Sequence, residues 1–126
     1  MHPALAVALG GAAGSLARFY MVVALRRYDT LFPWGTLLVN VLGSFLIGAV
    51  WAWCLARPGT PEWVRVGLMT GVLGGYTTLS SVSLESVLLI ESGAWAPAAA
   101  NIAATFGLGM LACGLALWLC RPLFAA

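Results

Sequence analysis

One apolar stretch of the sequence carries an unusual run of groups that could bind an ion. Between Gly71 and Glu85, paired glycines are followed by five hydroxyl side chains within seven residues and then by an acid. Glycines favour a break in a membrane helix, and the polar backbone of a break is tolerated only inside protein or beside water. Carbonyls freed in this way coordinate cations, and freed amide ends coordinate anions. In the alternative interpretation, the hydroxyls bond back to their own helix and the glycines only allow close packing.

Two other polar side chains, Asn40 and Arg18, lie within apolar stretches, and like the acid Glu85 each has two interpretations. Asn40 offers amide donors either to an anion or to a neighbouring membrane helix, and its residue type does not separate the two. Arg18 either extends to the membrane surface or supplies positive potential at the mouth of an anion pathway. Glu85 either faces the protein interior, with Ser81 one turn away on the same helix face, or lies at the membrane rim.

The composition indicates that the lipid bilayer is the natural solvent of this chain. Of its 126 residues, 62% are hydrophobic and 8% are charged, against roughly 25% charged residues in soluble domains. A soluble fold would expose larger apolar patches than soluble monomers show. Six arginines and four acids are too few and too scattered for a nucleic-acid interface. We expect no enzyme, because the sequence shows no nucleotide-binding loop or nucleophile-base pair, and its single histidine, His2, is terminal.

Four stretches have the roughly 20 mostly apolar residues that a spanning helix needs. They are expected at residues 4–25, 35–55, 64–90 and 94–120, joined by short connectors with proline, glycine or charged residues. The predicted fold is an all-α membrane protein, a single transmembrane domain over residues 1–126 with four transmembrane helices and a break in the third. The tryptophans fall mostly near the predicted span ends, as interfacial anchors do.

The arginines are almost evenly divided between the two ends of this predicted bundle. Arg57, Arg65 and Arg121 belong to the side that holds both termini, and Arg26 and Arg27 to the other. Because arginine bias sets the orientation of membrane proteins, a chain this balanced is expected to insert both ways and to form an antiparallel dimer. A dimer is also expected because four thin helices alone do not wall a pore on every side.

Small residues spaced four apart predict close helix contacts in three of the spans. They are Gly10 and Gly14 in the first span, Gly67, Gly71 and Gly75 in the third, and Thr105, Gly109 and Cys113 in the fourth.

Three sequence motifs resemble those of one membrane family. The run GGYTTLSSVSLE, which ends at Glu85, is similar to the GGxTTFSTFSxE signature of the Fluc/CrcB fluoride-channel family. The run that begins at Gly35, GTLLVNVLGSFLIG, is similar to the family pattern GTLxVNxxGSFxxG. The run that begins at Gly10, GGAAGSLARFY, is similar to GGxxGAxxRY and contains the arginine at Arg18.

The resemblance implies a fluoride-specific ion channel in the cell membrane that exports fluoride passively and lowers its cytoplasmic concentration. Members of the family are antiparallel, dual-topology dimers with two anion pores and a structural Na⁺ ion at the dimer centre. The matching ligands here are the main-chain carbonyls of Gly74 and Thr77 from both subunits, and carbonyl oxygen suits a hard cation. Arg18 matches the family arginine, for which we favour a structural and electrostatic role near a pore mouth.

The resemblance also assigns pore-lining positions. Asn40 matches the pore-lining asparagine of the family, and in the fourth span Asn101 and Thr105 align where the family tends to have tyrosine and serine. The remaining predicted pore-lining residues follow the break in the third span, and they are Thr78, Leu79, Ser80, Ser81 and Val82.

Two of these positions depart from the family pattern. Leu79 and Val82 replace the two phenylalanines whose positive ring edges line the anion path. A homodimeric channel is the first interpretation. A non-conducting partner subunit of a heterodimeric channel is the alternative that this departure motivates. A proton-coupled multidrug exporter is disfavoured, because such exporters need an acid in the first span and this chain has Arg18 there.

Overall fold

The computed structural model describes residues 1–125, which form four long helical spans. All four are long and apolar enough to cross a membrane, as the sequence predicted. The first span is α1 (Pro3–Leu25), which is followed by the single 3₁₀ turn η1 (Arg26–Tyr28). The second span is α2 (Trp34–Ala56). The last span is α6 (Trp95–Ala125). It continues past Cys120, where the apolar pattern placed its end, and includes Pro122 in its final turn.

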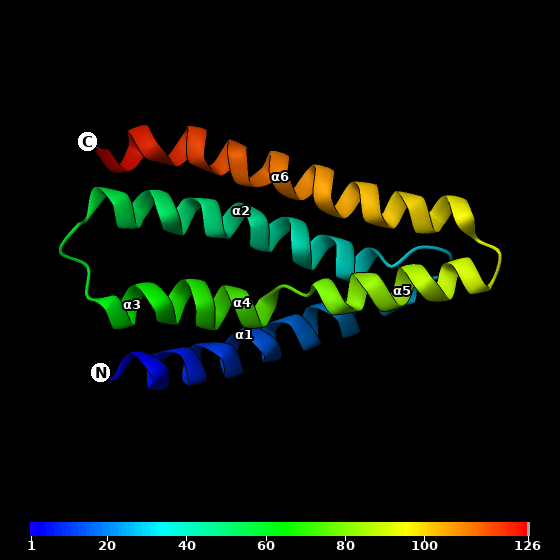
Figure 1. The fold of residues 1–126 in the computed structure, drawn as a ribbon, viewed down its shortest axis with the longest axis horizontal. Helices are drawn as coiled ribbons and strands as arrows, with labels where there is room; N and C mark the ends of the chain where they lie inside the picture. Colours follow the sequence, from blue (N-terminus) through cyan, green and yellow to red (C-terminus); the bar gives the residue numbers. More distant parts are fainter. Residues whose placement is uncertain (126) are drawn as a thin grey trace.

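The third span is divided into four segments. It begins with α3 (Glu62–Val66), widens into the π-helical segment η2 (Gly67–Leu73) and returns to an α-helical turn in α4 (Gly74–Tyr76). After two non-helical residues it resumes as α5 (Leu79–Glu91). The predicted break is therefore present, and Figure 1 shows it as a short coil between α4 and α5. A π-helical segment is a frequent companion of functional sites in membrane helices.

The spans pack as two helix pairs that meet at the centre of the bundle. α2 lies along α6, and α1 lies along η2 and α4, with α5 completing the third span against α6 (Figure 1). Both termini lie at the same end as the α2–α3 loop, as four spans require. The loop that contains η1 and the turn between α5 and α6 lie at the opposite end.

Glycines set the distance between α1 and the third span. A methyl group added at Gly75 would lie 2.6 Å from the Gly11 carbonyl oxygen, and one added at Gly71 would lie 3.0 Å from the Val7 carbonyl oxygen. These contacts join backbone to backbone, as small residues permit in membrane helices. The close contacts predicted for the first and third spans are therefore present, and they bring the polar groups of α1 to the break.

Replacing Gly14 by alanine is expected to destabilise the fold. The added methyl would lie 2.8 Å from the Val72 carbonyl carbon and 2.9 Å from the Tyr76 nitrogen, both of them backbone atoms. Overpacking of this kind costs about 1–3 kcal/mol, so thermal unfolding in detergent should occur at a lower temperature. Gly114→Ala is the matched control, because no atom of another segment within residues 1–125 lies within 4 Å of its added methyl. Equal losses in both variants would contradict this account.

Candidate ion pathway at the broken third helix

The break in the third span is made by two residues in extended conformation. Thr77 has φ −82° and ψ 158°, and Thr78 has φ −153° and ψ 112°. The N–H of Thr77 still donates to the Leu73 carbonyl at 3.0 Å, which ends the first half of the span. The hydroxyl of Thr78 accepts from the N–H of Ser81 at 3.2 Å and caps α5. The threonine pair thus stops one helix and starts the next within the membrane.

Asn40 on α2 pairs with the extended backbone of Thr78. Its Oδ1 accepts from the Thr78 N–H at 2.8 Å, and its Nδ2 donates to the Thr78 carbonyl at 3.1 Å. The same Nδ2 donates to the Thr36 carbonyl one turn earlier on α2, at 3.0 Å. An amide nitrogen has two hydrogens, so both donors of Asn40 are used within the protein. The helix-to-helix bond that the sequence allowed is present, and the role of Asn40 toward an anion stays a prediction.

Polar groups of α1 complete the hydrogen bonding of the break. The guanidinium of Arg18 donates from Nη1 to the Thr77 carbonyl at 3.1 Å. Ser15, one turn earlier, donates to the Gly75 carbonyl at 3.5 Å. Arg18 is half-buried and reaches the interior of the bundle rather than the membrane surface. This contact places a fixed positive charge beside the break, which fits the structural and electrostatic role expected for Arg18.

The main-chain oxygens at the break are compatible with a hard cation. A continuous helix would donate the Thr78 N–H to the Gly74 carbonyl, but that N–H donates to Asn40 instead. Thr77 keeps a second lone pair on its carbonyl beside the bond from Arg18. Within residues 1–125, no group of three or more acid, histidine or cysteine side chains is placed to hold a metal. Oxygens of Gly74 and Thr77 from two chains would therefore have to supply the ligands of the predicted Na⁺ ion.

A groove of about 420 Å³ follows the break between α2, the third span and α6. Six residues predicted for the pore or the cation line it, and they are Asn40, Gly74, Thr77, Thr78, Leu79 and Thr105. The hydroxyl of Thr105 is buried and has no hydrogen-bond partner within residues 1–125. The structure thus brings the break and three predicted threonines, Thr77, Thr78 and Thr105, to one open, mostly apolar groove.

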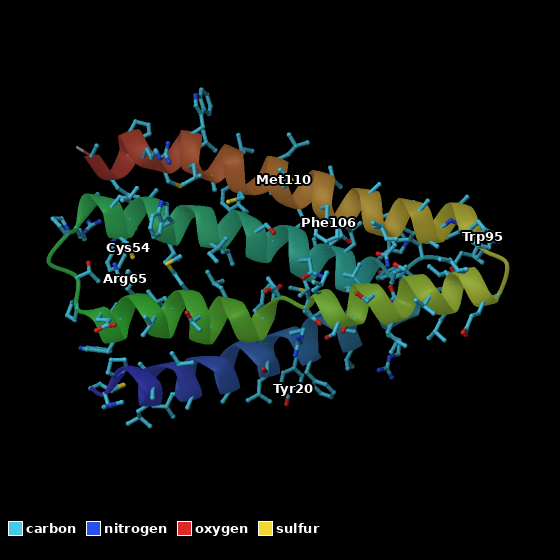
Figure 2. The ribbon with its side chains drawn as sticks, in the orientation of Figure 1. Tyr20, Cys54, Arg65, Trp95, Phe106 and Met110 are labelled. Carbon is cyan, nitrogen blue, oxygen red and sulfur yellow. The ribbon has the colours of Figure 1, made fainter. Side chains whose placement is uncertain are left out.

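The groove also contains residues that the motifs did not single out. Phe106 and Met110 project from α6 beside it, at the positions labelled in Figure 2. Phe106 is the residue after Thr105 and is 52% exposed. An aromatic ring is therefore available at the groove although Leu79 and Val82 are aliphatic. The one sequence signal for an aromatic ring at the groove is the position of Phe106 directly after Thr105, which aligns with a pore position of the family.

Four predicted pore residues lie outside this groove. Ser80 and Ser81 do not line the groove, but their hydroxyls lie 3.2 and 3.1 Å from the hydroxyl of Thr78, which does. Val82 is buried within the chain, with 2% of its surface exposed. Asn101 is fully buried on α6 and donates to the Ser86 hydroxyl at 3.1 Å, while its Oδ1 has no partner within residues 1–125. These positions stay predictions as pore-lining residues.

Glu85 takes its hydrogen bond from α2 rather than from its own helix. The Thr36 hydroxyl donates to Glu85 Oε1 at 2.5 Å, whereas Ser81 is bonded to Thr78. The other oxygen, Oε2, is buried and has no partner within residues 1–125. Glu85 also borders a cavity of about 510 Å³ that Asp29 and the α5–α6 turn help to line. The acid faces protein, as acids in membrane spans usually do.

The fold and this site define a class of protein: a multi-pass membrane protein whose third helix is broken beside an open groove. Residues 5–117 match the family described as CrcB-like protein, Camphor Resistance (CrcB), and the chain belongs to this family.

Three curated relatives cover nearly all of the chain, and each is named "Fluoride-specific ion channel FluC". The protein of Rhizobium meliloti (strain 1021) is 48% identical over 93% of this chain and 96% of its own length. That of Sorangium cellulosum (strain So ce56) is 43% identical over 94% of each chain. That of Bordetella petrii (strain ATCC BAA-461 / DSM 12804 / CCUG 43448) is 45% identical over 89% of this chain and 88% of its own length.

Replacing Asn40 by alanine is expected to loosen the break. The N–H and carbonyl of Thr78 would lose their partner, and a buried unpaired polar group costs about 1–3 kcal/mol. Hydrogen-exchange mass spectrometry should show faster exchange across residues 74–82, together with a lower unfolding temperature. Ser83→Ala is the control, because the Ser83 hydroxyl donates only to Leu79 in its own helix, at 3.0 Å. Unchanged exchange over residues 74–82 in the Asn40 variant would show that the break is held by other groups.

Proposed function

We propose that this chain is a fluoride-specific ion channel in the cell membrane that lets fluoride leave the cell passively and so lowers its cytoplasmic concentration. The observation that carries the proposal is the break in the third helix, whose extended threonine pair lies at an open, mostly apolar groove, in a chain whose relatives are named fluoride channels. A channel of this kind carries out no catalysis, so the chain is not an enzyme. Its partners are the transported ion, the lipid bilayer and a second channel subunit.

The hydroxyls of the groove support passage of a small, strongly hydrated anion. Moving a bare charge into a low-dielectric medium is prohibitive unless other donors replace its water. Thr78 lines the groove from the break and Thr105 lines it from α6. The hydroxyls of Ser80 and Ser81 lie outside the groove but form a cluster with that of Thr78 at the start of α5. A hydroxyl hydrogen rotates to suit its partner, so this cluster can turn donors toward an anion without moving the backbone.

Phe106 compensates for the missing aromatic residues at Leu79 and Val82. The edge of a phenyl ring carries positive partial charge and attracts an anion. Phe106 lines the groove opposite the break and has more than half of its surface exposed. Leu79 contributes an apolar wall at the same groove. The anion path therefore combines hydroxyl donors with one ring from the fourth span.

The proposed channel is an antiparallel homodimer with dual topology. The groove is open along the side where Leu79, Phe106 and Met110 are exposed, at 64%, 52% and 76% of their surface. A second copy of the chain would supply the missing wall. Stacking the two breaks against each other would also bring the Gly74 and Thr77 carbonyls of both subunits together, where a Na⁺ ion would neutralise their partial charges and hold the dimer centre.

Fluoride efflux from proteoliposomes tests the function. Vesicles containing the purified chain and loaded with fluoride should release it when a potassium ionophore removes the opposing potential, as measured by a fluoride electrode. A fluoride-specific path predicts that the same vesicles retain chloride when they are loaded with it. Protein-free vesicles give the background.

Three outcomes of this assay separate the alternatives. If Phe106→Leu lowers efflux and the matched Phe19→Leu on the exposed face of α1 does not, the Phe106 ring belongs to the anion path. Absence of efflux from the purified chain would remove the homodimeric channel. Efflux restored only by adding another family member would establish the heterodimeric alternative.

Replacing Na⁺ by N-methylglucamine is expected to weaken the dimer. A ligand that binds only the assembled state stabilises it by RT ln(1 + [L]/Kd), so the unfolding temperature in detergent should rise with Na⁺ concentration at constant ionic strength. Light scattering coupled to size-exclusion chromatography should report the mass of two chains in Na⁺. Equal stability in both salts, with the mass of one chain, would contradict the proposed dimer and its cation.

A further inference from the structure

A small cavity lies toward the end of the bundle that holds both termini. It begins about one turn beyond the groove, since Ile47 and Met69 line the groove and Trp51 and Arg65 line the cavity. It has a volume of about 80 Å³ and is enclosed by the C-terminal end of α2, the α2–α3 loop and α3. Two arginines, Arg57 and Arg65, line it from different segments. The rest of its wall consists of Trp51, Cys54, Leu55, Pro58 and Thr60. Figure 2 shows Cys54 and Arg65 facing each other across this end of the bundle.

The loop holds Arg57 in place before any ligand arrives. Both the N–H and the hydroxyl of Thr60 donate to the Arg57 carbonyl, at 2.9 and 2.8 Å, and close the turn. The guanidinium carbon lies 5.2 Å from the centre of the Trp53 ring and 5.9 Å from that of Phe124. Stacking on aromatic faces is a favourable arrangement for arginine. Neither Trp53 nor Phe124 lines the cavity, so an anion there would have to be bound by guanidinium N–H groups that stay free beside this stacking.

The charge at this end favours an anion, and the charge at the opposite end does not. Arg57, Arg65 and Arg121 face a single acid here, Glu62. At the opposite end Arg26 and Arg27 are matched by two acids, Asp29 and Glu91.

We propose that this cavity binds the phosphate group of an anionic membrane lipid. Guanidinium groups match the geometry and charge of phosphate oxygens. One water molecule occupies about 30 Å³ in the liquid, so the cavity has room for a phosphate group but not for a whole ligand. Trp51 and Leu55 beside it are 41% and 55% exposed and offer an apolar wall to the adjoining chain. Tryptophan belongs at the membrane interface, which is where a lipid phosphate lies.

The proposed site is distinct from the channel function. Neither Arg57 nor Arg65 lines the groove at the break. Basic residues near the membrane surface contribute about 1 kcal/mol each to the attraction of anionic lipid, which corresponds to about fivefold in affinity. That diffuse contribution applies to Arg121 as well, so a phosphate group held in the cavity predicts a loss greater than about fivefold for each cavity arginine, as expected for charge-assisted hydrogen bonds.

Native mass spectrometry of the detergent-purified protein tests the proposal. The wild-type chain should retain phosphatidylglycerol in preference to phosphatidylcholine with the same acyl chains. Arg57→Gln and Arg65→Gln should each lose more than the about fivefold in affinity for phosphatidylglycerol that diffuse surface charge accounts for. Arg65 lies on the exposed surface of α3, so its variant tests charge with little effect on packing, and an unchanged unfolding temperature without lipid verifies its fold.

Arg121→Gln is the matched control, because Arg121 lies near the same end and does not line the cavity. An equal loss in this variant would overturn the proposal in favour of diffuse surface charge. Equal retention of the two lipids by the wild type would also overturn it. A parallel titration with inorganic phosphate separates the two sources of the same chemistry. Binding of the free ion without retention of phosphatidylglycerol would assign the cavity to a soluble anion and exclude the lipid.

Discussion

The pairing of Asn40 with the backbone of Thr78 is the interaction on which the site depends. Within a membrane, an interrupted helix is tolerated only if its released N–H and carbonyl groups find other partners. One side-chain amide satisfies both groups of Thr78 and is itself anchored to the preceding turn of α2. The break can then persist as a fixed geometry, with the Gly74 carbonyl relieved of its helical partner and the hydroxyls of α5 placed at the start of a new helix.

Packing of α1 against the third span also supplies hydrogen-bond partners for the backbone of the break. Backbone contact at Gly71 and Gly75 leaves no room for side chains between the helices. That proximity lets Arg18 reach the Thr77 carbonyl and Ser15 reach the Gly75 carbonyl. Three kinds of side-chain group therefore hydrogen-bond to the backbone at the break: an amide, a guanidinium and a hydroxyl. The groove is the space that remains on the side where α2 and α6 do not close over the break.

The fold could be predicted from the sequence more fully than the site could. Apolar length gave the four spans, and the glycines before Thr77 gave the break. The partners across helices were harder to predict, because spacing along one helix does not determine its register against another. Glu85 illustrates this, since its hydrogen bond comes from Thr36, 49 positions away, and not from Ser81 on its own helix. For the same reason, spacing does not predict that Phe106 lines the groove. The motif that assigns Val82 to the pore likewise does not indicate that its side chain is buried within one chain.

The contact between Arg18 and the broken helix has a consequence for biogenesis. A charged residue deep in an isolated membrane helix is costly, by about 2.5–3.5 kcal/mol on insertion scales. Its acceptor in the finished protein lies 59 positions later in the chain and emerges from the ribosome well after α1. The first helix therefore enters the bilayer before its stabilising partner exists. Translation of the third span is the step that supplies this partner.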